Sequence, residues 1–301
     1  MRPNNPLSLP EIGDPRRIIG QRTFDFSKQV AVMAVVNRSQ DSFYDHGVTF
    51  SFEAALAKVE SDLESGADWI DIGAVPFSPI AASVSEEEEI NRVVPFIEYI
   101  RGRTDAVLSV DTFRSEVARR ALAAGADVIN DTSGLSDPRM AGVIADAKAS
   151  VVITHSKAPP GEQLRNPTYE DVVAEVREFL IARSAYAEEH GIDPGKIIVD
   201  PGHDLNKNTY HSLELTRRLS ELNNLGYPLL VAVSNKDFIA EALDAPQDEL
   251  GPGTIAAIVI CVLQGARIVR VHDPRTVISA INVVAAMLGW RPPPSPRHNR
   301  E

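Results

Sequence analysis

The feature that most constrains the fold is a short apolar run that ends in a polar residue and recurs along the chain. In one copy, Ile197 to Val199 precede Asp200 and a Pro-Gly turn. Such a run, between a charged residue and a turn, is typical of a strand buried on both faces. Seven further runs have the same form and span residues 30–37, 68–73, 106–112, 127–131, 150–155, 228–235 and 266–273.

The spacing of these eight runs predicts a closed barrel. Asn37 ends the first run and His272 lies near the end of the last, so each unit takes about 34 residues, enough for one strand, one helix and their loops. Strands that alternate with helices pair in parallel, and eight such units predict an α/β protein with a (β/α)8 TIM barrel. An open doubly wound sheet is the alternative, but its usual Gly-rich turn is absent after Asn37.

The residues outside these units predict short additions to a single barrel domain over 17–290. Residues 17–26 have the pattern of a β-hairpin around Gly20 and Gln21, which we expect to close the bottom of the barrel. Residues 1–16 are predicted to be disordered, and residues 291–301 are predicted to form a flexible tail.

Charge and composition exclude several classes of function. The net charge of −12 argues against a nucleic-acid partner, so any anionic ligand needs a local cationic cluster. The single cysteine, Cys261, excludes a disulfide framework. No apolar stretch reaches the roughly 20 residues of a membrane span, and there is no signal-peptide pattern, so we expect a cytoplasmic protein without a membrane partner.

The polar ends of the predicted strands should face one common mouth of the barrel. These residues are Asn37, Asp71, Asp111, Asn130, Asp131, His155, Asp200, Lys236, Arg270 and His272. The Asp and Asn side chains suit a flat heterocycle with several N–H groups and ring nitrogens. Arg270 and His272 lie two apart on one strand and, with an Asn ligand for a hard cation, suit a phosphate or diphosphate bound through Mg2+.

Two other polar groups are predicted to be solvated. The run Glu86–Glu89 fits an acidic first helical turn better than a metal site. The pair His203 and Asp204 is interpreted as exposed loop residues.

Five segments resemble dihydropteroate synthase, a barrel enzyme of folate biosynthesis. They are residues 33–43, 109–118, 128–134, 200–202 with Lys207, and 233–238 followed by 268–273. The ordered set spans the chain from about residue 17 to about residue 287. The resemblance implies a transferase that condenses dihydropterin pyrophosphate with p-aminobenzoate and releases pyrophosphate.

The resemblance also implies roles for individual residues. The catalytic set is Asp111, Asp200 and Lys236, and the substrate-binding set is Asn37, Asp111, Asn130, Asp200, Ser234, Lys236, Arg270 and His272. Within these sets the acids, the amide and the lysine hold the pterin, Arg270 and His272 bind the diphosphate, and Asn37 is the Mg2+ ligand. A homodimer through late helices, including residues 254–263, is implied as well.

The departures from the family pattern fall in the half of the site that takes the arylamine. The family's second loop contains Gly-Gly-Glu-Ser-Thr-Arg-Pro-Gly, whereas residues 73–80 are Gly-Ala-Val-Pro-Phe-Ser-Pro-Ile and lack the Thr-Arg pair. In the first loop, Arg38-Ser39-Gln40 stands where Val-Thr-Pro is usual. A family Met-His-Met is Thr-His-Ser at residues 154–156, Ser-Arg-Lys is Ser-Asn-Lys at 234–236, and Gly-Ile-Gly-Phe-Gly-Lys is Gly-His-Asp-Leu-Asn-Lys at 202–207.

Three functions therefore stay open. We favour a dihydropteroate synthase-like transferase with unusual loops, in which Arg38 could replace the missing guanidinium. The alternative is a pterin-binding paralogue whose arylamine condensation is lost or changed, because loss of a charge clamp costs roughly 2–4 kcal/mol at a transition state. A methyltransferase barrel that presents methyl-tetrahydrofolate is third, since it would not need Arg270 and His272.

Overall fold

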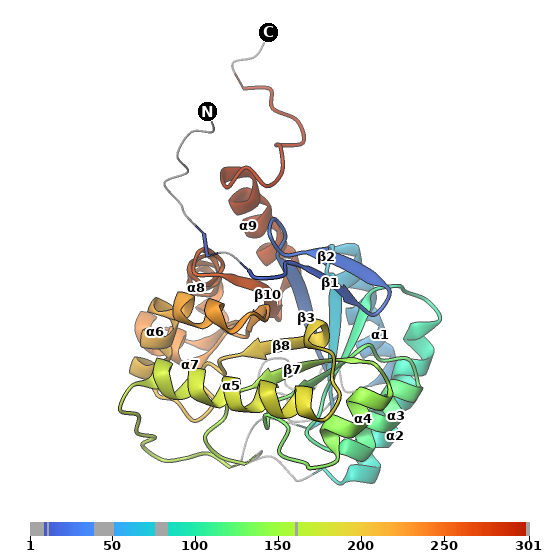
Figure 1. Ribbon diagram of the computed structural model, residues 1–301. Coiled ribbons are helices and arrows are strands. Elements are labelled where there is room, and N and C mark those ends of the chain that lie inside the picture. The colour runs from blue at the N-terminus through green and yellow to red at the C-terminus, as the bar shows by residue number, and fades with distance from the viewer. Residues whose placement is uncertain (1–8, 11, 39–50, 76–83, 160–161, 299–301) are drawn as a thin grey trace.

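The chain folds into a closed barrel of parallel strands, which confirms the predicted fold class (Figure 1). The computed structural model describes residues 9–10, 12–38, 51–75, 84–159 and 162–298. The barrel order is β10-β3-β4-β5-β6-β7-β8-β9, so each strand lies beside its neighbour in sequence and the last closes on the first. The strands are β3 Ala31–Asn37, β4 Trp69–Gly73, β5 Val107–Asp111, β6 Val128–Asp131, β7 Ser150–Thr154, β8 Ile197–Asp200, β9 Leu229–Val231 and β10 Ala266–Val271.

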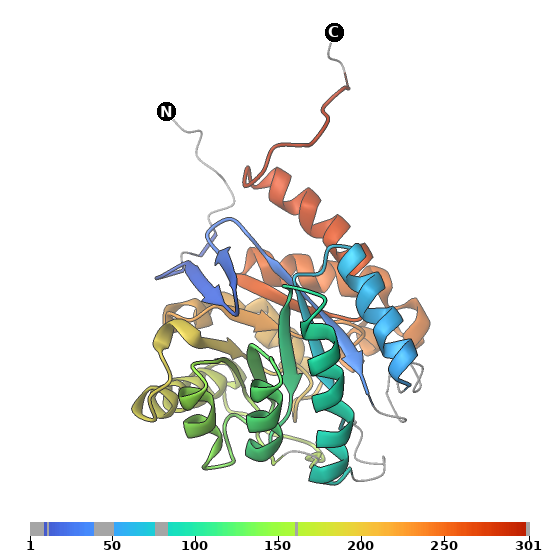
Figure 2. The same ribbon diagram turned by 90° about the vertical axis from the view of Figure 1, so that its right-hand side faces the viewer.

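Helices cover the outside of this barrel, as Figure 2 shows from the side. The α-helices are α1 Phe52–Glu64, α2 Glu86–Arg101, α3 Ser115–Ala123, α4 Met140–Asp146, α5 Val172–Glu189, α6 Thr209–Arg217, α7 Asp237–Leu243, α8 Gly251–Leu263 and α9 Pro274–Met287. Short 3-10 helices are η2 Pro194–Lys196, η3 Leu219–Leu225 and η4 Gln247–Glu249. None of the helices within the described ranges is long and apolar enough to cross a bilayer.

Alternation along each strand separates two hydrophobic cores. On β7, Val152 belongs to the core inside the barrel, whereas Val151 and Ile153 belong to the core between strands and helices. Successive side chains of a strand point to opposite faces, so the position after Val152 on the inner face is Thr154. The same parity decides which polar strand ends reach the mouth.

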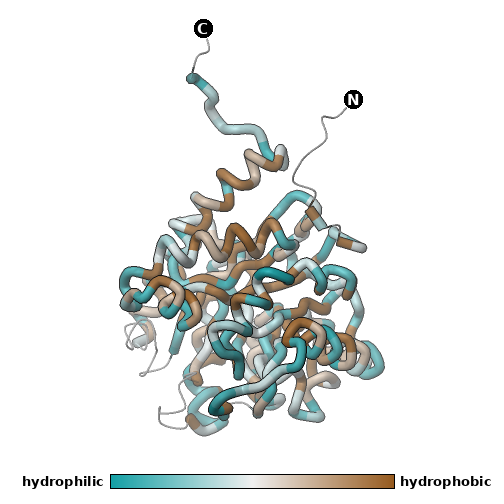
Figure 3. Tube along the Cα trace, turned by 90° about the vertical axis from the view of Figure 1, so that its left-hand side faces the viewer, coloured by the Kyte–Doolittle hydropathy of each residue, from teal (hydrophilic) through white to brown (hydrophobic). Residues whose placement is uncertain are grey.

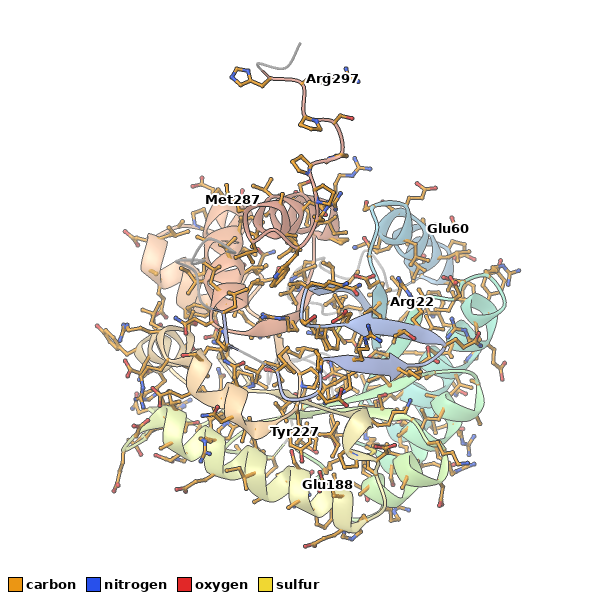
Figure 4. All side chains as sticks on the ribbon, turned by 45° about the horizontal axis from the view of Figure 1, so that its top comes forward. Arg22, Glu60, Glu188, Tyr227, Met287 and Arg297 are labelled. Carbon is orange, nitrogen blue, oxygen red and sulfur yellow. The ribbon has the colours of Figure 1, made fainter. Side chains whose placement is uncertain are left out.

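The predicted hairpin is present and closes one end of the barrel. It consists of β1 Arg16–Ile19 and β2 Arg22–Asp25, paired antiparallel. Phe24 and Phe26 are fully buried in the inner core, stacked at 5.6 Å. Figure 4, tilted toward this end, labels Arg22, which donates to the Asp68 carboxylate (3.1 Å) and carbonyl (3.0 Å) at the start of β4.

One predicted strand is shorter than its apolar pattern. The predicted strand spans residues 228–235 and begins with an apolar run, but β9 covers only Leu229–Val231. Asn235 adopts a left-handed conformation with φ 54° and its backbone N–H bonds Thr254 Oγ1, which turns the chain into α7. The paired part of the strand ends at Val231, two residues before the apolar run does, and the turn follows that run.

The outer surface of the late helices keeps exposed apolar residues. Ile260 on α8 and Val283 and Met287 on α9 are exposed, and the tube in Figure 3 is hydrophobic along much of α9. Homodimerisation through this region and the domain bounds 1–16, 17–290 and 291–301 stay predictions. Residues 1–8, 11 and 299–301 lie outside the described residues. Most of the two loops in which this chain departs from the family pattern also lies outside them.

We predict that Phe24→Ala lowers the free energy of unfolding by about 3–5 kcal/mol, because it empties a packed position inside the barrel floor. Ile18→Ala, a control on the exposed face of the same hairpin, should change it by less than about 0.5 kcal/mol. Urea unfolding measures both. Equal effects of the two variants would show that the hairpin does not seal the inner core.

Candidate functional site

An arginine at the barrel mouth joins the carboxylates of two other strands. Arg270 Nε donates to Asp71 Oδ2 at 2.7 Å, and its Nη2 donates to Asp111 Oδ2 at 3.0 Å. Asp71 is fully buried and also accepts from Ser109 Oγ (2.6 Å) and Asn130 Nδ2 (3.1 Å). This network therefore brings together groups from β10, β4, β5 and β6.

Burial favours the protonated form of Asp111. Its burial raises its pKa to about 7, the charge of Arg270 opposes the rise, and the charge of Asp71 adds to it. Near neutral pH the carboxyl can thus either accept a proton or donate one. A carboxyl with a raised pKa at the mouth of a barrel is a candidate functional group.

Asp200 lies at the end of β8 beside a turn that only glycine fits. Asp200 Oδ1 accepts from the Gly202 N–H at 2.8 Å, and burial raises the pKa of Asp200 to about 6. Gly202 has φ +68°, and a Cβ there would lie 2.1 Å from the His155 carbonyl oxygen. The Pro-Gly turn after the strand therefore holds the carboxylate in place through its backbone.

Lys207 is buried behind this turn and ties it to β7. Its Nζ lies 2.9 Å from His155 Nδ1 and donates to the carbonyls of Gly202 (2.8 Å) and Leu205 (3.2 Å). Burial lowers the pKa of Lys207 to about 7 and that of His155 to about 2. His155, which we placed at the mouth from sequence, thus supports the loop rather than joining the Arg270 network.

The prediction that His203 and Asp204 are solvated is wrong. His203 is 1% exposed, and its Nε2 lies 3.1 Å from Thr216 Oγ1. The Asp204 carboxylate accepts from Ser212 Oγ at 2.8 Å and from the Phe238 N–H at 3.3 Å, so it bonds the first turn of α7. The pair is an internal connection between the β8–α6 loop and two helices.

Asp204 and Asn206 occupy left-handed backbone positions, with φ 63° and 50°. Both stand where the family pattern has glycine. Asn and Asp tolerate this conformation better than other side chains, so the loop can keep such a path and gain two polar groups. The Asn206 side chain accepts from the Leu164 N–H (2.6 Å) and donates to Ser156 Oγ (3.1 Å), both in the preceding loop.

The remaining predicted residues lie at the ends of β9 and β10. His272 Nδ1 is 3.2 Å from Ser234 Oγ, which places these two together. Lys236 lies two residues after Ser234, at the N-cap position of α7. Asp131 differs, because its carboxylate accepts from Ser133 and Leu135 in its own turn and so organises that turn instead of facing the barrel mouth.

Arg38 points away from the mouth. Its guanidinium lies over the rings of Phe52 (5.6 Å) and Phe96 (5.1 Å), between α1 and α2. Asn37 faces the barrel interior, so the alternation of side chains could have indicated from sequence that Arg38 faces outward. Arg38 Nε and Nη1 find no hydrogen-bond partner within the described part of the chain.

Sequence reasoning missed a second buried ion pair. Glu89, which we expected in a solvated helical turn, is fully buried and lies 2.6 Å from Arg114 Nη1. Arg114 also donates to the Val84 carbonyl at 2.8 Å. The only signal for Glu89 was its place at the inner edge of an amphipathic helix.

Oxygen ligands for a hard cation are sparse at the mouth. No cluster of three His, Cys, Asp or Glu side chains suited to a metal occurs among the described residues. The Asn37 amide oxygen and the Asp111 side chain both lie within about 4 Å of the position that a Cβ atom on Gly73 would occupy. One or two protein oxygens fit Mg2+, which usually completes its shell with water and substrate phosphates.

Comparisons with known proteins place this site in a family context. A family model described as pterin binding enzyme matches residues 33–272. The chain is 42% identical over 268 residues to inactive dihydropteroate synthase 2 of Mycobacterium leprae, which covers 87% of this chain and 92% of that protein. It is 38% identical over 275 residues to dihydropteroate synthase of Synechocystis sp., which covers 91% and 94% of the two chains.

A solved structure is similar over nearly the whole chain. Xanthomonas albilineans dihydropteroate synthase with 4-aminobenzoic acid has a TM-score of 0.83 and 38% identity, and the match covers 91% of this chain and 98% of that one. The same protein has been solved with 7,8-dihydropteroate, at a TM-score of 0.79, 36% identity, and coverage of 90% and 98%.

We predict that Gly202→Ala destabilises the fold by more than about 2 kcal/mol, because its Cβ meets the His155 carbonyl and its φ is positive. Gly142→Ala is the control, since nothing lies within 4 Å of a Cβ in that helix, and it should be neutral or stabilising. Chemical denaturation compares them. A neutral Gly202→Ala would mean that the turn can relax.

A second prediction concerns acid stability. Burial lowers the pKa of His203 from 6.5 to about 3, so below about pH 6.5 the unfolded chain takes up a proton that the folded chain does not. Stability should therefore fall as pH falls from about 6.5 to about 3. In His203→Gln this loss should be shallower by about 1.4 kcal/mol per pH unit. Urea unfolding at several pH values measures the slopes, and parallel slopes would contradict the assignment.

Proposed function

Because the chain belongs to the pterin-binding enzyme family that includes the dihydropteroate synthases, we propose that it binds a dihydropterin pyrophosphate at the barrel mouth and has lost or changed the condensation with p-aminobenzoate. The first part is supported by the acids and the amide at the strand ends. The second part is supported by the residues of the arylamine half.

The proposed ring site consists of Asp111, Asn130 and Asp200, with Lys236 beside it. Asp111 and Asp200 have pKa values raised by burial to about 7 and about 6, so each can share a proton with the ring. Asn130 is fixed by its bond to Asp71 and keeps its carbonyl oxygen for a ligand. Fixed polar groups in a buried site are suited to stabilise charge that develops on a bound heterocycle.

The proposed diphosphate site consists of Arg270, His272 and Ser234, with Asn37 for the metal. Arg270 is held at the mouth by its bonds to Asp71 and Asp111, so its positive charge is fixed there, and the Ser234–His272 contact orients the imidazole. Asn37 would hold Mg2+, which supplies charge neutralisation for the leaving diphosphate when bound. These residues would orient the diphosphate at the edge of the ring site.

The position of Arg38 is the observation that carries the proposal for the arylamine half. The chain lacks the family's loop-2 Thr-Arg pair, and Arg38 was the candidate replacement. Its guanidinium lies over Phe52 and Phe96, between α1 and α2, and the residue is 8% exposed. A clamp that is missing and not replaced would cost about two to three orders of magnitude in rate.

The comparisons favour the same reading over the condensing enzyme that we preferred from sequence. Proteins named inactive dihydropteroate synthase 2, from Mycobacterium leprae and Mycobacterium tuberculosis, are 42% and 41% identical to this chain, and proteins named dihydropteroate synthase reach 38%. Identity differs little between the two groups. The residues of the loops therefore weigh more than the percentages, and a condensing enzyme with p-aminobenzoate as acceptor is the second candidate.

The expected result is tight binding without normal turnover. Calorimetry with dihydropterin pyrophosphate and Mg2+ should show binding, and p-aminobenzoate should accelerate pyrophosphate release at least about 100-fold less than in an active synthase. Release at a normal rate would establish the condensing enzyme instead. Absence of binding would reject the pterin site.

Asp111→Asn is the matching site variant. It should weaken pterin binding at least about tenfold, because an amide cannot share a proton with the ring as the carboxyl does. Asp105→Asn changes the same charge just before the same strand, at its exposed opposite end, and should leave binding unchanged. Equal loss in both variants would point to a general electrostatic effect rather than to contact.

A further inference from the structure

Thr154 is an inward-facing residue that the proposed site does not use. It is the last residue of β7, two positions after Val152, which belongs to the core inside the barrel. Side chains two apart on a strand share a face, so Thr154 faces the barrel interior at the mouth end.

The neighbours of Thr154 are the strands that carry the proposed ring site. In the register of β7 and β8, Thr154 is the partner of Asp200. In the register of β6 and β7, Asn130 is the partner of Val152, directly below Thr154 on the same face. Thr154 therefore lies between the two strands that supply Asn130 and Asp200.

The hydroxyl of Thr154 is buried and unsatisfied. The residue is 1% exposed, and its Oγ1 has no hydrogen-bond partner in the part of the chain that the structure describes. Leaving a buried hydroxyl unpaired is unfavourable, and such groups in native proteins usually have a partner. Asn130 and Asp200 are covered to a similar degree, at 2% and 4%, whereas the Asp111 side chain is 17% exposed.

The two branches of this side chain have different surroundings. A Cβ at Gly202 would lie 3.4 Å from Thr154 Cγ2, so the methyl group packs against the turn after β8. The hydroxyl is the other branch. We propose that Thr154 Oγ1 hydrogen-bonds the polar edge of a pterin ring bound between Asn130 and Asp200, and that Thr154 is a specificity-determining residue of this site.

This inference rests on the proposed function and adds a ligand contact to it. A hydroxyl both donates and accepts, which matches a pterin edge where ring nitrogens alternate with amino and oxo groups. The family pattern has methionine at this place, and a thioether is only a weak acceptor. The exchange replaces an apolar contact by a directional one and so changes which ring edges the site accepts.

The same strand offers a matched control. Ser150 lies four residues before Thr154, on the same face of β7, and is also 1% exposed. Its Oγ likewise lacks a partner among the described residues. Because Ser150 lies at the opposite end of the strand, its hydroxyl is too far from the mouth to meet a ligand there.

The test compares Thr154→Val, Thr154→Ser and Ser150→Ala by calorimetry. The ligands are dihydropterin pyrophosphate with Mg2+ and hydroxymethyl dihydropterin without the diphosphate. Thr154→Val keeps the shape and loses the hydroxyl, so we expect its Kd to rise about fivefold to tenfold for both ligands. Thr154→Ser should restore binding to within about twofold of wild type, and Ser150→Ala should leave it unchanged.

Thermal unfolding of the unliganded variants separates binding from stability. A structural role would lower the Tm of Thr154→Val in parallel with its affinity, whereas the proposed contact predicts an equal or higher Tm with weaker binding. Should Thr154→Val fail to fold, Thr154→Ala against Thr154→Ser makes the same comparison.

Wild-type affinity in Thr154→Val, or an equal loss in Ser150→Ala, overturns the inference while the proposed function stands. A wild-type protein that binds neither ligand overturns both.

Discussion

The contact of Arg270 with Asp71 and Asp111 is the interaction on which the mouth depends. A carboxylate as deeply buried as Asp71 is tolerable only with a cation and hydrogen-bond donors around it, and Arg270, Ser109 and Asn130 supply them. The partners come from different strands, so the same bonds fix the relative positions of those strands at the mouth. Binding chemistry and barrel geometry are thereby set by one group of side chains.

The positions of the departures explain how one half of a site can change while the other stays. In the proposed ring site, Asp111 and Asn130 lie on strands and bond Arg270 and Asp71 of other strands. Asp204 and Asn206 belong to a loop, where left-handed backbone positions accept Asp or Asn in place of glycine. Substitution there alters contacts between loops without moving Asp200, because the Gly202 N–H still fixes that carboxylate.

The barrel and its mouth could be predicted because both follow from local pattern. Apolar runs of fixed spacing give the strands, and parallel strands present their ends on one side. The pairing of particular groups could not be predicted, because it depends on tertiary packing. Lys207, for example, meets His155 only because the β8–α6 loop folds back against the end of β7.

The errors have the same origin. His203 and Glu89 look solvated in sequence, and only packing against α6 and α3 buries them. Side-chain alternation would have oriented Arg38 correctly, since Asn37 before it faces inward. A resemblance of motifs cannot reveal such contacts, because it fixes positions along the chain and not the direction of each side chain.

The N-terminal hairpin has a consequence for synthesis. Phe24 and Phe26 are synthesised before all eight barrel strands, but the inner core that covers them includes Ile268, and Arg267 bonds the Phe26 carbonyl across 241 residues. Their covering is therefore incomplete until the last barrel strand, β10, has emerged. During that interval the two aromatic rings expose apolar surface. A chaperone bound near the hairpin would cover these rings until the barrel closes over them.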